Sequence, residues 1–236
     1  MLLASPASAV LWRADLTNAP AMPTNELQHA GALLYTPIKF CGGSGTWLGG
    51  KWFLTARHAV DDWSAGSLTV HLPAFGGHYP VKAIHLPPNK SADIALLELA
   101  AFPTNQSSLT LSSCTNETGW HIWMAGFGNF GPAGKVQGFG SVHCGENVVD
   151  SVNDFTARFS FSKPPEAKPF EACPAMFDSG GSIFFERNGK LTLGGVIVRV
   201  TERTAPNYGA KARYTRISRQ AEWLKKTAPE LPWEEQ

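Results

Sequence analysis

Short apolar runs separated by glycine and proline recur along most of this chain of 236 residues. Residues 67–72 and 78–86 alternate apolar and polar side chains, which is typical of strands with one buried face. Clusters of glycine and proline between the runs supply turns. The pattern predicts an all-β protein, with strands at 32–35, 51–56, 67–72, 78–86, 93–99, 120–125, 136–142, 155–161, 182–185 and 191–200.

The two ends of the chain break this alternation. Residues 1–25 are rich in proline, alanine and asparagine without a clear period, so we expect an irregular leader there. Residues 218–226 have the apolar spacing of a short helix, which Ser218 can cap and Pro229 can stop. Between these ends, residues 112–118 are typical of a linker that joins two halves of the chain.

Length, charge and composition narrow the class of protein. A chain of this length can bury the core of one large β domain or of two small barrels. Its 20 basic and 19 acidic residues give a net charge of +1, which provides no argument for a nucleic-acid partner. The tryptophans lack the neighbouring basic cluster that a base-stacking surface requires. No apolar run reaches the ~18 residues needed to span a bilayer.

Cysteines and histidines are the candidate metal ligands. The four cysteines, at positions 41, 114, 144 and 173, permit two disulfides in three different pairings. Their wide spacing disfavours a zinc site, in which cysteines usually come in close pairs. Histidines at 71, 78 and 85 recur at a spacing of seven, and in one continuous strand they would alternate faces. We therefore expect packing or surface roles for these histidines, and no metal site.

The N-terminal residues leave two interpretations open. Residues 7–9 (Ala-Ser-Ala) fit the small-residue pattern at a secretory signal cleavage site. The basic region that normally begins such a signal is missing, and the apolar stretch is short. The segment is either the end of a truncated signal peptide or an ordinary chain terminus.

A candidate nucleophile lies in residues 177–182, which read Phe-Asp-Ser-Gly-Gly-Ser. The glycines allow backbone conformations that other residues avoid, so Ser179 is expected on a tight turn. A serine hydroxyl is a weak nucleophile at neutral pH and needs a base, which in turn needs an orienting group. His58 follows the apolar run 52–56, and Asp93 begins another at 93–99. Each residue alone suits an ordinary structural role, but together they fit a nucleophile, a base and an orienting acid.

These three segments, in this order, resemble the chymotrypsin/trypsin-like serine proteases. The family's Thr-Ala-Ala-His, Asp-Ile-Ala-Leu-Leu and Gly-Asp-Ser-Gly-Gly motifs correspond to Thr-Ala-Arg-His at 55–58, Asp-Ile-Ala-Leu-Leu at 93–97 and Phe-Asp-Ser-Gly-Gly at 177–181. Residues 40–44, 125–128 and 187–200 resemble the strand before the histidine, the Gly-Trp-Gly turn and the strand lining the substrate pocket. The resemblance extends over about residues 26–227.

The resemblance implies two antiparallel Greek-key β-barrels packed together, followed by a short C-terminal helix. We expect the N-terminal barrel in residues 26–115, and the C-terminal barrel with the helix in residues 116–236. In the cleft between the barrels, His58 would be the general base, Asp93 would orient it and Ser179 would attack the substrate. Backbone amides of Ser179 and Phe177 would form the oxyanion hole.

Two departures from the family pattern bear on this site. Phe177 stands where the family has glycine, and bulky residues resist the positive φ that glycine tolerates. Either its amide turns away from the oxyanion, or the loop adopts an acceptable backbone beside the cleft. Many family members pair the aspartate before the nucleophile, here Asp178, with a freed Ile-Val-Gly-Gly terminus, which this chain lacks. We expect Asp178 to find a different partner or to stay exposed.

An alignment with the family places the substrate pocket at Cys173, Met176, Val198, Arg199 and Val200. Cys173 stands where trypsin-like enzymes carry the specificity aspartate, so we expect no preference for arginine or lysine. Arg199 indicates either an acidic substrate residue or an ordinary solvated side chain. Cys41 lacks its usual family partner, because Ala59 stands there, and Cys144 and Cys173 are candidates for a bridge near the pocket.

We therefore expect a secreted or periplasmic serine endopeptidase that acts as a monomer on protein or peptide substrates, without a cofactor. The even number of cysteines in a protease-like chain favours an oxidising compartment. The alternative is a pseudo-protease that keeps the fold but binds or inhibits a partner, which the unusual Phe177, Val198, Arg199 and Val200 favour. A third hypothesis is a protease that stays quiescent until a substrate rearranges the loop at Phe177.

Overall fold

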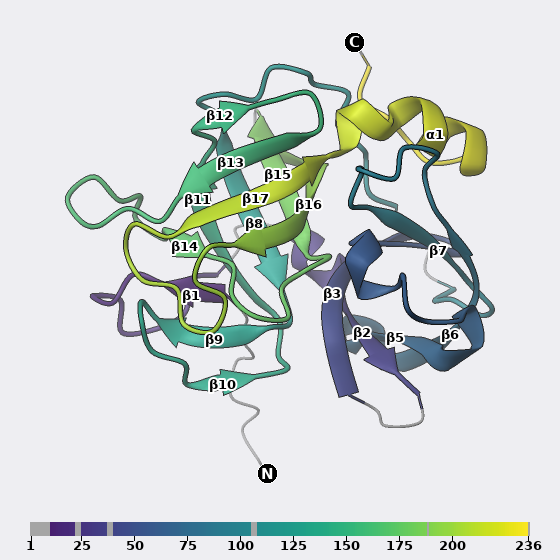
Figure 1. Ribbon diagram of the computed structural model, residues 1–236, viewed down its shortest axis with the longest axis horizontal. Helices are drawn as coiled ribbons and strands as arrows, with labels where there is room; N and C mark the ends of the chain where they lie inside the picture. Colours follow the sequence, from purple (N-terminus) through teal and green to yellow (C-terminus); the bar gives the residue numbers. More distant parts are fainter. Residues whose placement is uncertain (1–9, 22–24, 37–39, 105–107, 188, 236) are drawn as a thin grey trace.

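The computed structural model describes residues 10–21, 25–36, 40–104, 108–187 and 189–235, so residues 7–9 lie outside it. Figure 1 shows a mostly β chain in two halves, the N-terminal one drawn largely in blue and the C-terminal one largely in green. One hydrophobic cluster joins Trp47 and Leu96 of the first half to Trp123 and Phe184 of the second. The predicted mostly β fold with two packed halves is therefore confirmed.

The first half is a closed barrel of six antiparallel strands. Around the barrel these are β2 (Ala30–Tyr35), β3 (Phe40–Gly49), β4 (Trp52–Thr55), β7 (Ala95–Leu99), β6 (Gly77–His85) and β5 (Leu68–Leu72). Trp47 of β3 and Phe53 of β4 are fully buried in the hydrophobic core of this half. Gly45 leaves room for the Phe53 ring, since a Cβ at Gly45 would lie only 2.2 Å from it. Side chains therefore fill the barrel, as is usual for barrels this small.

The second half is built on a sheet of seven antiparallel strands that curls into a half-barrel. In spatial order these are β11 (His143–Val148), β8 (His121–Gly126), β15 (Ser182–Arg187), β16 (Lys190–Val200), β17 (Lys211–Arg216), β13 (Thr156–Ser160) and β12 (Ser151–Val152). Its core contains the fully buried Phe159, Phe185 and Tyr214. Strand β16 carries Val198, Arg199 and Val200, which the sequence predicts to contact substrate.

A strand lies within the leader that the sequence predicts to be irregular. β1 (Val10–Trp12) pairs in parallel with β9 (Asn129–Pro132) and antiparallel with β14 (Ala172–Cys173). These strands and β10 (Gly138–Phe139) form a separate four-stranded sheet. All three residues of β1 are buried, so the strand is stabilised by partners more than a hundred residues away. Three residues are too few for a period to reveal it in the sequence.

The strand predicted at 136–142 is wrong for most of its length, because only β10 pairs there. The sequence pattern also missed β9 and β11. Strand β11 contains Glu146 and Asn147, yet both are buried. The Glu146 carboxylate accepts the Phe170 amide at 2.7 Å, and the Asn147 amide donates to Ala172 O at 3.0 Å. The hydrophobic pattern did not predict this strand, because two of its buried residues are polar and form hydrogen bonds with backbone groups from other segments of the chain.

The chain ends in a 3-10 turn (Ile217–Gln220) that continues into the helix α1 (Ala221–Thr227). The predicted helix is confirmed, but Ser218 does not cap it: its hydroxyl lies 3.4 Å from Glu117 Oε1. Leu224 packs into the same hydrophobic cluster as the first barrel, and Trp52 Nε1 donates to Glu230 at 2.6 Å. The helix therefore leads the chain back to the first barrel (Figure 1). Across the described residues, no helix has the length and apolar character to cross a bilayer.

The structure describes all four cysteines and shows no disulfide among them. Cys144 pairs with Ala125 in the seven-stranded sheet, whereas Cys173 pairs with Leu11 in the four-stranded sheet. The Cys41 thiol donates to a carbonyl of its own strand, Gly43 O, at 3.4 Å. The expectation of disulfides, including a bridge between Cys144 and Cys173, is therefore wrong. The cysteines thus give no support to an oxidising compartment.

Candidate active site

His58 and Asp93 are positioned by neighbouring strands of the first barrel. His58 lies in the 3-10 turn Arg57–Ala59 that follows β4, and Asp93 lies just before β7. The last residue of β4, Thr55, pairs with Ala95 at the start of β7. Because the two strands are antiparallel, both side chains emerge at the same end of the barrel.

The Asp93 carboxylate holds His58 by two hydrogen bonds. His58 Nδ1 lies 2.7 Å from Asp93 Oδ2, and the His58 backbone amide donates to Asp93 Oδ1 at 3.0 Å. An ionised carboxylate only accepts hydrogen bonds, so Nδ1 carries the proton and Nε2 is left as the basic nitrogen. The side chain of His58 is 47 % exposed, so this nitrogen can receive a proton from outside the barrel.

Asp93 stays ionised beside the histidine. Burial raises the pKa of Asp93, but the hydrogen bond from the His58 ring, the charge of that ring and the backbone amides of Arg57 and His58 outweigh it. The net result is a pKa below the usual value for aspartate. The Asp93 carbonyl accepts a further hydrogen bond from Thr215 Oγ1 at 3.0 Å, which ties this residue to strand β17 of the second half.

Ser179 lies on the turn before β15, and this turn is anchored to both halves. The Ser44 amide of β3 donates to Ser179 O, and the Gly180 amide donates to Ile197 O of β16, both at 2.8 Å. Gly180 has φ +92°, and a Cβ there would lie 2.1 Å from Ser44 O. Only glycine fits this position, as expected for a tight turn.

The serine hydroxyl is turned toward β16. Ser179 Oγ donates to Val198 O at 3.3 Å, and among the described residues no hydrogen bond joins it to His58. The two side chains nevertheless line one cavity of about 540 Å³, together with Asp93. The structure therefore brings the three predicted residues to one site, with the hydroxyl in a rotamer that does not face the base.

Most residues predicted for the substrate pocket line this cavity. Met176, Val198, Arg199 and Val200 are among its walls. Cys173 is not: it is fully buried in β14, and burial raises the pKa of its thiol well above the usual value. The structure thus places Cys173, like its neighbour Ala172, in the hydrophobic core of the second half, which an ungapped alignment to the family cannot reveal.

The cavity walls also contain residues that the sequence analysis missed: Gly42, Ala175, Ile197, Arg203 and Arg213. Arg213 pairs directly with the predicted residue Arg199 across β16 and β17. A pairing of these two strands could have revealed it, but the sequence gives no register for that pair. Arg203 lies in the loop after β16, where no motif marks it.

Phe177 has a positive φ, the backbone conformation that bulky residues are expected to avoid. Its φ is +73°, a region where non-glycine residues carry strain of about 1–3 kcal/mol. The Ser44 hydroxyl donates to Phe177 O at 2.9 Å, and the Phe177 ring lies 4.9 Å from that of Phe139. These contacts hold the loop in the positive-φ form, which bulky residues only adopt when their surroundings demand it. The Ser179 amide donates to no protein acceptor within the described part of the chain.

Asp178 is completely buried and binds backbone amides. Its carboxylate accepts hydrogen bonds from Gly128 N at 2.9 Å, from Ala175 N at 2.8 Å and from the backbone of Val10. The expectation of a different partner is therefore confirmed. Burial outweighs these hydrogen bonds and raises the pKa of Asp178 to about 7.

Two glycines make room for this carboxylate. A Cβ at Gly126 would lie 2.2 Å from Asp178 Oδ1, and one at Gly128 would lie 2.9 Å from Asp178 Cγ. The segment 125–128, which resembles the family's Gly-Trp-Gly turn, thus packs directly against the residue before the nucleophile. It leaves space for the Asp178 carboxylate and also donates the Gly128 amide to it, and so helps to fix the turn that carries Ser179.

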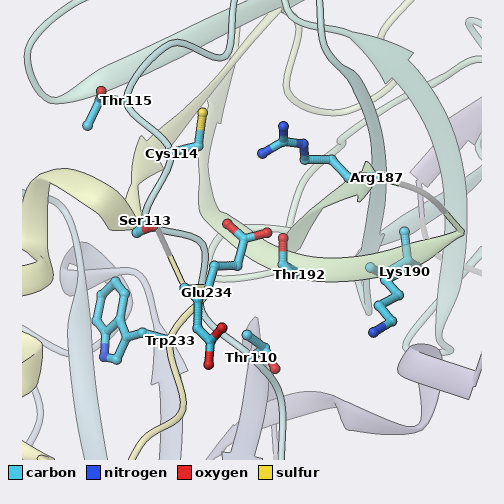
Figure 2. Close-up of a pocket in the computed structure, with 11 residues that line it drawn as sticks. Thr110, Ser113, Cys114, Thr115, Arg187, Lys190, Thr192, Trp233 and Glu234 are labelled. Carbon is cyan, nitrogen blue, oxygen red and sulfur yellow. The ribbon is translucent and has the colours of Figure 1, made fainter.

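A larger cavity, of about 960 Å³, lies elsewhere in the molecule (Figure 2). Arg187 and Lys190, from the hairpin of β15 and β16, lie on one side of it, and Trp233 lies across from them. Its lining contains Ser113 and the carboxylates of Glu234 and Glu235 but no histidine, so no imidazole accompanies this serine. The three residues predicted for catalysis line the other cavity, at Ser179.

The histidines at 71 and 78 lie together, contrary to the prediction. His71 of β5 is directly opposite His78 of β6, and their rings are 4.5 Å apart. The alternation argument failed because a turn separates the two residues, so they belong to two paired strands. Across the residues described, no group of three or more potential ligands could hold a metal ion.

Comparison with known families places most of the chain, and not only its motifs, in one family. A family model described as Trypsin matches residues 19–224 of this chain, which includes all the elements that carry His58, Asp93 and Ser179. No curated protein matches the chain.

Proposed function

This chain belongs to the trypsin family, and from that premise we propose that it is a serine endopeptidase with Ser179 as nucleophile, His58 as general base and Asp93 as the orienting acid. The substrate is a protein or peptide, and the reaction needs no cofactor. Secretion or export to a periplasm belongs to the same proposal, supported by the family resemblance and by the Ala-Ser-Ala sequence at 7–9.

In the proposed reaction, Ser179 Oγ attacks a peptide carbonyl while its proton passes to His58 Nε2. The Asp93 carboxylate stabilises the imidazolium that forms. His58 then returns the proton to the leaving amine, and an acyl group stays on Ser179. Water, activated by the same histidine, hydrolyses this ester and restores the serine. The Ser179 amide, together with that of Phe177, would bind the oxyanion.

One observation supports this proposal above the others. His58, oriented by Asp93, lines the same cavity as Ser179. The tautomer is set by the 2.7 Å contact of Nδ1 with an ionised carboxylate. A rotation about χ1 of Ser179, between staggered rotamers, is the motion required to turn Oγ from Val198 O toward His58.

The second candidate is the pseudo-protease that binds or inhibits a partner. It is favoured by the hydrogen bond from Ser179 Oγ to Val198 O, because a hydroxyl engaged with a carbonyl is not activated. The third candidate, a protease that stays quiescent until a substrate rearranges the loop at Phe177, also starts from this inactive hydroxyl. It differs in predicting that the hydroxyl turns toward His58 once the cavity is occupied.

Labelling with a fluorophosphonate, which acylates activated serines, tests the proposal. We expect stoichiometric labelling of the wild-type protein, and its loss in both Ser179→Ala and His58→Ala. Circular dichroism of the three proteins provides the control for folding. A well-folded wild-type protein that shows no labelling, even with saturating peptide present, would instead favour the pseudo-protease.

A further inference from the structure

We propose that the substrate of this protein is an acidic polypeptide segment, bound by a row of arginines that leads away from the cavity at Ser179. The row consists of Arg199, Arg213 and Arg158, and we call it the arginine row. The inference rests on the proposed endopeptidase function and specifies its substrate class.

The cavity at Ser179 carries an excess of positive charge. Arg199, Arg203 and Arg213 are among its walls, and Asp93 is the acidic residue there. Both carboxylate oxygens of Asp93 already accept hydrogen bonds from His58. Within the described residues, none of the three guanidinium groups has an ion pair or a hydrogen bond. An anionic ligand is therefore the complement that this cavity lacks.

The strand register extends this charge into a row. Arg199 of β16 is directly opposite Arg213 of β17, and Arg213 is directly opposite Arg158 of β13. Residues directly opposite each other on antiparallel strands share one face of the sheet, with Cβ atoms about 5 Å apart. The three strands lie side by side in the C-terminal half (Figure 1). The arginine row thus crosses about 10 Å of sheet surface at the usual spacing between strands.

This arrangement is unfavourable for the protein alone. Like charges directly opposite each other destabilise a sheet, and here three occur in succession, with no ion pair to any of them in the part of the chain that the structure describes. A smaller cavity of about 250 Å³ lies along the row, lined by Arg158, Lys211, Arg199 and Arg213. The last two also line the cavity at Ser179, so the basic surface is continuous with the catalytic residues.

The position of the row favours a polypeptide over a nucleic acid. A ligand held by Arg199 reaches the cavity where Ser179 lies, and a peptide carries a carbonyl at every residue. Phe177 is the one phenylalanine, tyrosine or tryptophan among the residues that line the two cavities, and the ring of His58 is already held by Asp93. A single-stranded nucleic acid is usually held by several aromatic rings that stack on successive bases. Glutamate or aspartate side chains on an extended peptide supply anions without that requirement.

Binding to the Ser179→Ala variant tests the inference without turnover. Three fluorescent peptides of equal length are compared by anisotropy, one rich in glutamate, one with glutamine in its place and one with lysine. We expect the glutamate peptide to bind about tenfold more tightly than the glutamine peptide, because each partly exposed charge pair adds a factor of about two to five. Raising the salt from about 0.05 to 0.5 M should remove most of this difference, since exposed charges are then screened.

Charge-reversed variants, each combined with Ser179→Ala, show which arginines cause the preference for glutamate. Arg213→Glu and Arg158→Glu should each abolish the preference for glutamate over glutamine. Lys190→Glu, an exposed position at the other end of β16, should retain it, since strand geometry places it roughly 30 Å from Arg199. If Arg213→Glu fails to fold by circular dichroism, Arg213→Gln replaces it and should reduce the preference at least threefold.

The outcomes separate this inference from the proposed function. Equal affinity for the glutamate and glutamine peptides overturns the inference, even if fluorophosphonate labels Ser179. Equally tight binding of an oligonucleotide of the same charge overturns the commitment to a polypeptide. A glutamate preference that depends on the arginine row supports the inference, even if the serine is never labelled and the endopeptidase proposal fails.

Discussion

Asp178 makes the stability of this protein depend on pH in an unusual direction. Its carboxyl group is fully buried, and burial raises the pKa to about 7 from 3.8. Between these two values the folded protein holds a proton that the unfolded chain releases. The stabilisation from protonated Asp178 is complete below pH 3.8 and is lost as the pH rises through 7.

The size of this effect follows from the shift itself. One pKa unit corresponds to about 1.4 kcal/mol, so a shift of about three units is worth about 4 kcal/mol in the free energy of unfolding. The slope is a loss of about 1.4 kcal/mol per pH unit between pH 4 and 7. Other groups titrate in this window, such as His121, whose pKa a hydrogen bond to Glu146 raises. A difference between two variants removes their contribution.

The Asp178→Asn variant supplies that difference. Urea unfolding followed by tryptophan fluorescence gives the free energy of unfolding of both proteins at intervals from pH 4 to 8. We expect wild type to lose about 3–4 kcal/mol relative to Asp178→Asn over this range. The side-chain amide of this variant also leaves one backbone N–H without an acceptor, but that cost is the same at every pH. A difference that stays constant from pH 4 to 7 would show that Asp178 is not held protonated by burial.

Two further predictions concern the turn at the nucleophile. A chain that begins at Val10 would place an α-ammonium group beside Asp178, where the Val10 backbone now donates a hydrogen bond. This positive charge should lower the pKa of Asp178 and abolish the loss of stability between pH 4 and 7. An unchanged dependence of stability on pH would contradict this. Gly180→Ala should destabilise the fold by at least about 2 kcal/mol, because φ is +92° and the new Cβ would lie 2.1 Å from Ser44 O. Calorimetry of Gly180→Ala measures this effect, with Gly189→Ala as control, since it also has positive φ but meets nothing within 4 Å.

The sequence by itself determined the class of fold and the three residues that the site is built on. The alternation predicted at 67–72 survives in β5, where Leu68, Val70 and Leu72 are buried and the residues between them are half-buried, because one face of this strand packs into the core and this fixes a period of two. The segments around His58, Asp93 and Ser179 were also visible, since each lies next to an apolar strand. Their order along the chain was enough to indicate the family.

Tertiary structure alone decided how the surroundings of these residues are arranged. Strands β1 and β9 carry no usable period, because they are short and are held by pairing with distant segments. The sequence could not show that Val10 reaches Asp178, nor that Phe177 has positive φ, because contacts from other strands impose both. The arginine row has the same origin: Arg158, Arg199 and Arg213 are far apart in the chain and become neighbours only through the register of three strands. Local sequence sets the period of a strand, whereas register is set by the packing of the whole sheet.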